Sequence, residues 1–316
     1  MPARPDNDHA GLFWGFPNSY GTLGYALRCR VKLVPVAPFA VLQHATYSDP
    51  RTYFRDLADR CRRERLRPDG IAFIDGVFFG DEMIFTTGLF TADPPFDPSD
   101  YSFMRIYYRS LREREIDVLT TRNYIWRWDT DWFWCARAFG MEIPPVRFLF
   151  GVLGCLRSNT YWALRHWNER WRIVQRLGGM RSVEWVIQDV EVPVEHAVEF
   201  LEFLDRSIGI RPVWICPAQA YRPDAVYPLY RTDPGTLYIN FGFWGGVKSS
   251  QPPGFYNRLV EREVARLNGK KSLYSTTWYS EDDFWEHYNR PAYIALKGRY
   301  DPENVFPDLY AKCVAG

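Results

Sequence analysis

Residues 17–24 read Pro17-Asn18-Ser19-Tyr20-Gly21-Thr22-Leu23-Gly24 and lie almost at the start of a chain of 316 residues. Two glycines stand three positions apart, after a proline and a run of hydroxyl and amide side chains. Such a stretch predicts a tight turn whose backbone N–H groups can face an anion. A plain connecting turn has the same composition, so the motif alone does not distinguish an anion site from a connection.

The residues after this turn alternate in character. The basic side chains of Arg28, Arg30 and Lys32 fall on one side of an extended chain. The apolar side consists of Tyr25, Leu27, Cys29, Val31 and Leu33. This period of two predicts a half-buried strand over 25–33.

The composition excludes several classes of function. The net charge is +1, so no overall field attracts nucleic acid. Six cysteines lie at 29, 61, 135, 155, 216 and 313 without a Cys-x-x-Cys pair, which predicts no metal site, no disulfide framework and mostly buried, reduced thiols in a cytoplasmic protein. The longest apolar stretch, Phe148–Leu156, is far shorter than the roughly 20 residues of a transmembrane helix. No glycine-rich nucleotide motif and no hydrolytic triad is recognisable.

The rest of the chain predicts strands and helices in mixed order. We expect strands at 39–47, 70–78, 83–90, 182–192, 213–216, 237–243 and 272–278, and an extended segment at 116–133. We expect helices at 50–66, 105–112, 145–157, 160–177 and 254–267, one that opens at Pro193 and ends before Gly209, and one capped by Ser280. Because strands and helices do not alternate strictly, an α+β fold is favoured over a doubly wound parallel sheet.

The stretch 124–134 holds four tryptophans on even positions and charged residues on odd positions. In an extended chain this pattern makes one aromatic face and one charged face. The face could pack on a core, or form an aromatic wall over an elongated apolar substrate, with Trp126, Arg127 and Trp128 in contact with it. Stacking of single-stranded bases would need a basic groove that the charge balance does not favour.

Two further segments place polar side chains on strands that otherwise look buried. The first, 237–242, contains Tyr238 and Asn240, and the second, 271–277, contains Lys271 and Tyr274. A lysine after Gly269 is also compatible with a surface position, and a tyrosine here with a core position whose hydroxyl is satisfied.

Four segments, at 12–25, 237–242, 271–277 and 300–313, resemble in the same order the delta-24 sterol reductase branch of the vanillyl-alcohol-oxidase-type flavoproteins, whose FAD-binding domain is of the PCMH type. The resemblance implies that the first segment packs against FAD, the second lies close to the flavin and the third faces the isoalloxazine edge. It implies an α+β chain with three parts. These are a C-terminal remnant of the FAD-binding domain at 1–48, a mixed sheet and helix cap (substrate) domain at 49–300, and a tail at 301–316 that returns to the flavin side.

The resemblance also implies a function, that of an FAD-linked oxidoreductase in steroid metabolism. It would act on a C=C bond, or an alcohol, of an apolar, sterol-like substrate. Tyr274 and Lys271 are the candidate catalytic groups, because a phenol or an amine near the flavin can stabilise negative charge or move a proton. The implied cofactor-binding residues are Pro17, Ser19, Gly21, Thr22, Leu23, Gly24, Tyr238 and Asn240.

The position of the first motif, at residue 12, leads to a second hypothesis. In the family this motif follows most of the flavin domain, so the chain would lack most of the flavin-binding surface. The alternative is a truncated, catalytically incompetent chain, or a non-enzymatic binding domain that no longer holds FAD by itself. The aromatic and arginine-rich region 144–171 adds a third expectation, peripheral contact with a membrane.

Overall fold

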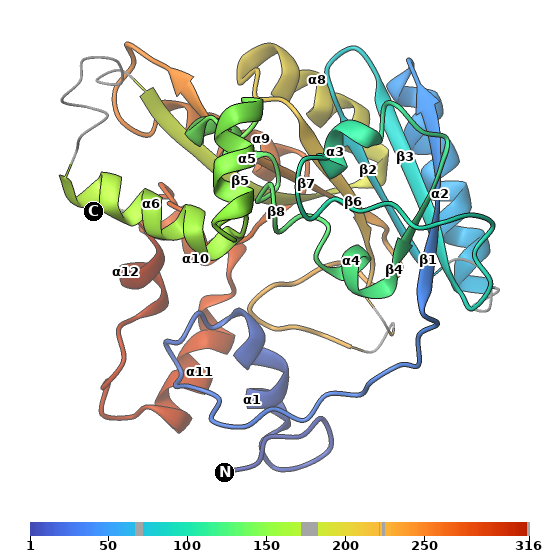
Figure 1. The fold of residues 1–316 in the computed structure, drawn as a ribbon. Coiled ribbons are helices and arrows are strands. Elements are labelled where there is room, and N and C mark those ends of the chain that lie inside the picture. The colour runs from blue at the N-terminus through green and yellow to red at the C-terminus, as the bar shows by residue number, and fades with distance from the viewer. Residues whose placement is uncertain (67–71, 172–182, 221, 223–224, 315–316) are drawn as a thin grey trace.

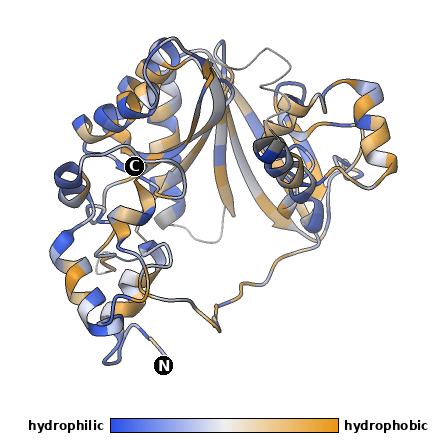
Figure 2. Ribbon diagram, turned by 90° about the vertical axis from the view of Figure 1, so that its left-hand side faces the viewer, coloured by the Kyte–Doolittle hydropathy of each residue, from blue (hydrophilic) through white to orange (hydrophobic). Residues whose placement is uncertain are grey.

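The computed structural model describes residues 1–66, 72–171, 183–220, 222 and 225–314 (Figure 1). Within this part of the chain, eight strands form one sheet in the order β4-β1-β3-β2-β6-β7-β5-β8, and neighbouring strands run antiparallel. Helices cover both faces of the sheet, as the side view in Figure 2 shows. The predicted α+β class is therefore confirmed.

The strands differ in length, and the longest pair lies near one edge. β5 (Val183–Pro193) and β7 (Tyr238–Lys248) pair over their full length, with Val183 opposite Lys248 and Pro193 opposite Tyr238. The other strands are β1 (Phe39–Tyr47), β2 (Phe73–Phe78), β3 (Met83–Thr91), β4 (Ile116–Thr120), β6 (Val213–Ala218) and β8 (Lys270–Lys271).

One face of the sheet packs against three amphipathic helices, α2 (Pro50–Leu66), α8 (Ala197–Ser207) and α9 (Phe255–Arg266). Alternate residues of β5 point into this core, because successive side chains of a strand point to opposite faces. The core joins apolar residues of β5 (Val186, Val190, Val192), α8 (Phe200, Leu201, Leu204) and α9 (Val260, Val264).

The other face carries a second, aromatic core. Short helices lie over it, namely α3 (Tyr107–Ser110), α4 (Thr121–Ile125), α5 (Pro144–Val152) and α6 (Ser158–Trp171), with the 3₁₀ turn η2 (Cys135–Phe139) between α4 and α5. Trp128 and Trp134 pack there on Leu42, Val77 and Ile84 of the sheet. Aromatic side chains fill this layer because each buries a large area.

The two ends of the chain form a separate unit, which we call the terminal lobe and define as residues 1–24 and 279–314. It contains α1 (Ala10–Gly15), η1 (Phe16–Asn18), α10 (Glu281–His287), α11 (Arg290–Tyr300) and α12 (Leu309–Cys313). Leu12 and Leu23 share one buried cluster with Phe284, Leu296 and Leu309. Lys297 Nζ fixes the glycine turn by donating to the carbonyl oxygen of Thr22 at 2.9 Å.

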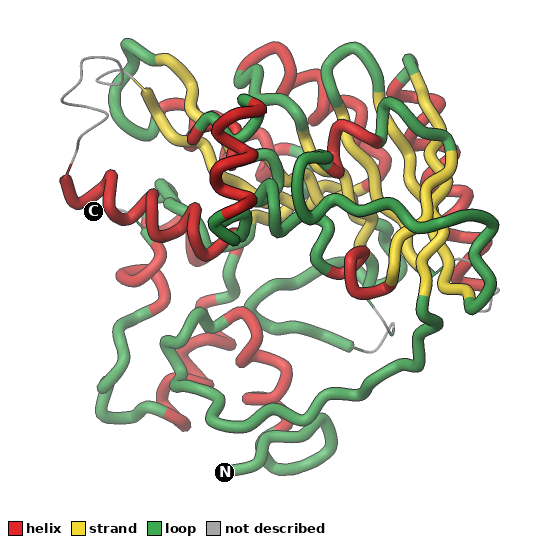
Figure 3. Tube along the Cα trace, viewed as in Figure 1, coloured by secondary structure: helices red, strands yellow, loops and turns green. Residues whose placement is uncertain are grey.

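Within the described residues several predicted elements are confirmed and three are wrong; residues 70–71, 172–177 and 182 of the predicted elements lie outside this part of the chain. Residues 25–38 form no strand and cross as a loop from the terminal lobe to β1 (Figure 3). Leu27 is 99% exposed and Leu33 is 82% exposed, because no described strand pairs with this segment. The predicted strand at 272–278 is also absent, since β8 ends at Lys271 and a turn follows.

The third error concerns the segment 116–133, which is extended only as far as Thr120. The Thr120 hydroxyl accepts a hydrogen bond from Asn123 N and so begins helix α4. Turns follow, and three consecutive aromatic residues, Trp132, Phe133 and Trp134, have positive φ angles of 44°, 50° and 57°. The tryptophans of this stretch therefore do not share one face.

Candidate functional site

Three segments singled out in the sequence meet at one place in the structure. The hydroxyl of Tyr20, in the glycine turn, accepts a hydrogen bond from Leu273 N at 2.9 Å. Tyr274, the next residue, donates its hydroxyl to Asp189 Oδ2 at 2.6 Å. Asn240 Nδ2 donates to the other oxygen, Asp189 Oδ1, at 3.1 Å. Asp189 thus links the 237–242 strand to the 271–277 segment, and Tyr20 links that segment to the glycine turn.

The sheet positions these groups, which we call the Asp189 cluster: Asp189, Asn240, Trp244 and Tyr274. Asp189 lies on β5 directly opposite Gly242 of β7, and Asn240 and Trp244 flank that glycine on the same face. A Cβ atom at Gly242 would lie 2.7 Å from Asp189 Oδ1 and 2.7 Å from the Trp244 ring. The glycine therefore leaves the space that the carboxylate and the indole occupy.

Tyr274 sits between a carboxylate and an indole. Its oxygen accepts from Trp244 Nε1 at 3.0 Å while its proton is directed to Asp189. Burial raises the pKa of Asp189, although the hydrogen bonds from Tyr274 and Asn240 act in the opposite direction. Burial, followed by the nearby Asp189 charge, raises the pKa of Tyr274 well above its usual value. The Tyr274 side chain is still about half exposed, while its hydroxyl is held by the two hydrogen bonds.

A second carboxylate lies two residues along β5, on the same face. Glu191 Oε2 accepts a hydrogen bond from the Tyr230 hydroxyl. Burial, with a smaller effect of the Asp189 charge, raises the pKa of Glu191 to about 7, although the hydrogen bond from Tyr230 acts in the opposite direction. Neither carboxylate was predicted from the sequence, because an acid that alternates with valines usually marks the solvated side of a strand. Their repeated placement at 189 and 191 in a predicted strand was the available signal.

Lys271, predicted beside Tyr274 as a catalytic group, has a different environment. Its side chain is fully buried, and Nζ donates to Glu261 Oε1 (2.9 Å), Thr277 Oγ1 (3.0 Å) and the Thr276 carbonyl (2.8 Å). These bonds use all three ammonium protons. Burial lowers the pKa of Lys271 and raises that of Glu261. The structure thus places Lys271 in an ion pair that anchors the loop carrying Tyr274.

In the predicted cofactor-binding turn several side chains are buried, whereas Gly21 and Gly24 are only partly buried. The side chains of Ser19 and Thr22 are fully buried, and their hydroxyls donate to the carbonyl oxygens of Phe16 and Ser19. Leu23 lies in the core of the terminal lobe, and Pro17 is exposed. Gly21 and Gly24 adopt positive φ angles of 75° and 126°, as expected for a tight glycine turn.

Two observations bear on whether an anionic, hydrogen-bonding cofactor fits here. The ammonium of Lys312 lies 3.1 Å from the position that a Cβ of Gly21 would take, so a cation stands beside the turn. Asn240 Oδ1 is buried and accepts no hydrogen bond from the described residues. Such an acceptor suits an N–H donor of a ligand. Tyr238, by contrast, is buried and its hydroxyl accepts from Asp233 N at 3.0 Å.

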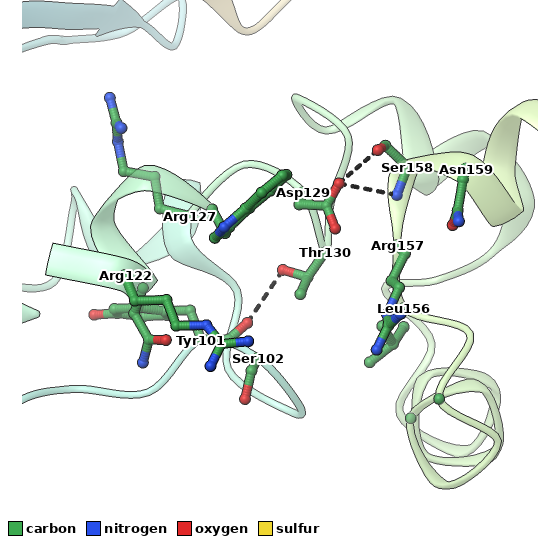
Figure 4. Close-up of a pocket in the computed structure, with 14 residues that line it drawn as sticks. Tyr101, Ser102, Arg122, Arg127, Asp129, Thr130, Leu156, Arg157, Ser158 and Asn159 are labelled. Carbon is green, nitrogen blue, oxygen red and sulfur yellow. Dashed lines mark hydrogen bonds between the residues drawn. The ribbon is translucent and has the colours of Figure 1, made fainter. Parts of the chain in front are cut away.

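Of the three residues predicted to contact substrate, Trp126 and Arg127 line one cavity and Trp128 does not. Trp128 is buried and stacks on Phe133 with 5.0 Å between ring centroids. The guanidinium of Arg127 lies 4.0 Å from the centre of the Tyr124 ring and donates to Asp75 Oδ2 at 3.1 Å. Trp126 is 61% exposed and, with Arg127, lines an open cavity of about 760 Å³ (Figure 4).

A group of aromatic rings that we call the aromatic wall lies beside the Asp189 cluster; it is part of the second core of the sheet, and Trp134 in it is buried. The Trp244 ring lies 5.1 Å from Phe133 and 5.6 Å from Trp134, measured between centroids. Trp214 of β6 extends the wall, 5.8 Å from Phe133. Because Trp244 belongs to the Asp189 cluster, this apolar wall begins where the polar groups end.

Within the described residues, no group of His, Cys, Asp and Glu is arranged to hold a metal ion. All six cysteines are free, with five partly buried and Cys29 exposed, so the thiols are less buried than predicted.

No family model matches the chain. Its sequence is 24% identical over 329 residues to the delta(24)-sterol reductase of Mus musculus, a match that covers 97% of this chain and 59% of that protein. The human delta(24)-sterol reductase is 24% identical over 328 residues with the same coverage, and that of Pisum sativum is 23% identical over 371 residues, covering 100% and 61%. The predicted resemblance to the delta-24 sterol reductases is therefore confirmed. The chain spans about three fifths of the length of these relatives.

Similar solved structures include two grass pollen allergens. The Bermuda grass isoallergen BG60 has a TM-score of 0.45 at 13% identity, and Phl p 4, described as having glucose dehydrogenase activity, has 0.43 at 11%. Each comparison covers 88% of this chain and 55% of the other.

Proposed function

We propose that this relative of the delta-24 sterol reductases carries the substrate-facing part of an FAD-linked oxidoreductase. The reaction would be at a C=C bond, or an alcohol, of an apolar, sterol-like substrate. The relation to sterol reductases over nearly the whole chain supports the reaction class. The observation that carries the proposal is the Tyr274 hydroxyl, held between Asp189 and Trp244 at the contact with the glycine turn. The proposal includes the predicted division of the chain into a remnant of the FAD-binding domain (1–48), a cap domain (49–300) and a tail that returns to the flavin side (301–316).

FAD, when bound, would supply hydride transfer. The backbone at Gly21 and Gly24, together with the Lys312 ammonium, would face its anionic part, and Asn240 Oδ1 would accept a hydrogen bond from it. The side chains of Ser19, Thr22, Leu23 and Tyr238 would act indirectly, by holding the turn and the start of β7 in place.

The chain's own contribution is proton transfer and orientation. Saturating a C=C bond requires a proton on one carbon, and Tyr274, whose side chain is about half exposed, carries the hydroxyl of the cluster. Burial raises the pKa of Asp189, which shifts its equilibrium toward the protonated carboxyl, and a protonated Asp189 would donate to the Tyr274 oxygen. The phenolic proton would pass to the substrate carbon while the Asp189 proton passes to the Tyr274 oxygen, so the negative charge would remain on the Asp189 carboxylate, and Trp244 Nε1 would hold the Tyr274 oxygen in place. The wall of Phe133, Trp134 and Trp214 would exclude water from the apolar substrate.

A purified chain titrated with FAD tests the cofactor part of this proposal. We expect quenching of tryptophan fluorescence and retention of flavin absorbance after gel filtration. Asn240→Ala should weaken binding about fivefold to tenfold, because one hydrogen bond with a buried acceptor is lost. Gln251→Ala, at an exposed position, is the matched control.

The alternative is a binding domain that does not hold FAD by itself. It is favoured by the burial of the Ser19 and Thr22 side chains, whose hydroxyls are used in hydrogen bonds within the turn. A folded, colourless protein that takes up no FAD in the titration, yet binds a sterol, would establish this alternative and exclude the enzyme.

A further inference from the structure

Helix α5 is apolar on two sides. Its inward side packs Val146 and Phe150 against a small buried cluster, and Arg147 is buried there in an ion pair with Asp131 at 2.7 Å. Its outward side exposes Phe148 (54%), Leu149 (56%), Val152 (65%) and, at the helix end, Leu153 (63%). A helix that is hydrophobic all round is normally buried in a core or in a membrane.

The four outward residues form one continuous surface. Positions i, i+1, i+4 and i+5 of a helix lie on the same side, so 148, 149, 152 and 153 adjoin one another. Phe103 extends the surface, with its ring centroid 5.8 Å from that of Phe148. We call these five residues the α5 surface. Single exposed apolar residues are ordinary, but a contiguous group marks an interaction site.

The surroundings of the α5 surface indicate the chemistry of its partner. Between Ile143 and Trp171 the sequence has four arginines and one histidine but a single acid, Glu169. On the next helix, α6, Trp162 and Trp167 are about half exposed, and the Arg165 guanidinium lies 5.3 Å from the Trp162 ring. Apolar insertion with tryptophan and arginine at the margin is typical of proteins that lie on a membrane.

The cavity of about 760 Å³ begins where α5 ends. Gly151, Gly154 and Arg157 line one side of it, and Arg122 of α4 approaches from the opposite side (Figure 4). Neither of these two guanidinium groups forms a hydrogen bond or ion pair with any described residue. The carboxylate of Asp129 also lines the cavity, but one of its oxygens accepts from Ser158 N at 3.3 Å at the start of α6. Two unpaired cations thus face one partly engaged carboxylate, which suits an anionic group.

We propose that the α5 surface and this cavity together bind an anionic phospholipid bilayer. The α5 surface inserts among the acyl chains, and Arg122 and Arg157 receive the anionic headgroup. The charge around the surface favours a bilayer over a second copy of the chain, whose α5 surface would bring the same arginines together. Binding itself does not depend on flavin or catalysis. Only the further point, that the bilayer presents the apolar substrate to the protein, rests on the proposed function.

Vesicle flotation tests the proposal without flavin or substrate, so its outcome is separate from that of the FAD titration. We expect flotation with phosphatidylserine-containing vesicles and much weaker flotation with phosphatidylcholine alone. Leu149→Ser and Val152→Ser should each weaken binding about tenfold on vesicles of either composition. Arg122→Gln and Arg157→Gln should each weaken it about fivefold on the anionic vesicles only.

Matched controls are Ile294→Ser, which replaces an apolar residue that is 56% exposed on α11, and Arg262→Gln on the exposed side of α9. Both should bind vesicles like the unmodified chain. The proposal is overturned if the chain floats with neither vesicle, or if the α5 and control variants bind equally. Dimers in light scattering that Leu149→Ser abolishes, without any vesicle binding, would assign the surface to a second copy. Full displacement from vesicles by soluble glycerophosphoserine would assign the cavity to a free anion and also overturn the proposal.

Discussion

The hydroxyl of Tyr274 donates to the carboxylate of Asp189 at 2.6 Å, although the two residues are 85 positions apart in the sequence. Each comes from a segment that packs differently: Asp189 from the long strand β5, Tyr274 from a turn anchored by the Lys271–Glu261 ion pair. The glycine turn contacts the same loop through Tyr20 and Leu273. The phenol is therefore held by the sheet, by α9 and by the terminal lobe together.

Replacing Tyr274 by Phe removes the phenolic proton and keeps the ring. If Tyr274 donates that proton to substrate, turnover of the FAD-loaded protein should fall about a hundredfold, the scale of one general acid. FAD affinity should change little, because Asn240 and the glycine turn are untouched. Tyr25→Phe, which alters an exposed tyrosine in the 25–38 loop, is the control. Unchanged turnover in Tyr274→Phe would contradict the assigned role.

Asp189 acts through Tyr274, so its test is a pH profile. Its pKa is raised by burial, and the mechanism needs the protonated carboxyl; turnover should therefore fall as pH rises through that pKa. Asp189→Asn can still donate a hydrogen bond to Tyr274 but cannot relay a proton. We expect lower turnover and a flattened pH profile. A variant that keeps the original pH profile would show that another group titrates.

Glu191 gives a prediction about stability. Its pKa is raised to about 7 in the folded protein from 4.5 in the unfolded chain, mainly by burial. The folded state then binds more protons than the unfolded state between these values, so the free energy of unfolding decreases as pH rises from about 4.5 to about 7. The loss is at most about 3 kcal/mol. Urea unfolding at both ends of this range should show it.

In Glu191→Gln the decrease in the free energy of unfolding with rising pH should disappear, since the amide does not titrate. Glu195→Gln, which changes an exposed acid four residues away, should keep the original dependence. An equal pH dependence in both variants would assign the effect to a different group.

Substitution of Lys271 distinguishes a catalytic role of its amine from a structural role. Lys271→Met leaves the buried carboxylate of Glu261 unpaired and should lower the free energy of unfolding by about 3–5 kcal/mol. The double variant Lys271→Met/Glu261→Gln should recover part of this loss, because no buried charge remains. Lys248→Met, at an exposed position on β7, should be neutral. A stable Lys271→Met variant that has lost turnover alone would instead favour the catalytic role.

The sequence correctly predicted the elements whose residues show a clear local periodicity. The predicted strand at 39–47 and helix at 50–66 coincide with β1 and α2, because alternation and an amphipathic face are local signals. The segment 25–33 has the same alternation but no partner strand, and pairing cannot be read from one segment. The prediction of an extended segment at 124–134 was wrong because Trp132 to Trp134 adopt left-handed backbone conformations, which turn the chain.

The candidate site was predicted in part. Tyr274 and Asn240 both bind Asp189, and the loop that carries Tyr274 contacts the glycine turn through Tyr20; their roles toward a cofactor remain predictions. Asp189 was missed because its proximity to Tyr274 depends on a turn after β8 that the sequence led us to interpret as a strand. The environment of Lys271 was missed for a related reason: its partner Glu261 lies on α9, and only the packing of that helix on β5 brings the two together.

Gly242 provides the last prediction, because it faces Asp189 across the β5–β7 ladder. In Gly242→Ala the new Cβ would lie 2.7 Å from both Asp189 Oδ1 and the Trp244 ring, so carboxylate or indole must shift. We expect a loss of about 1–3 kcal/mol in stability from overpacking, and a fall in turnover of roughly a hundredfold from the displaced proton donor. Gly298→Ala on α11, where a Cβ meets nothing within 4 Å, should instead stabilise the chain by about 0.5–1 kcal/mol. Urea unfolding and steady-state turnover of both variants measure the two effects. Normal turnover in a destabilised Gly242→Ala variant would show that the geometry of Asp189 and Trp244 does not limit the reaction, and would remove Asp189 from the mechanism.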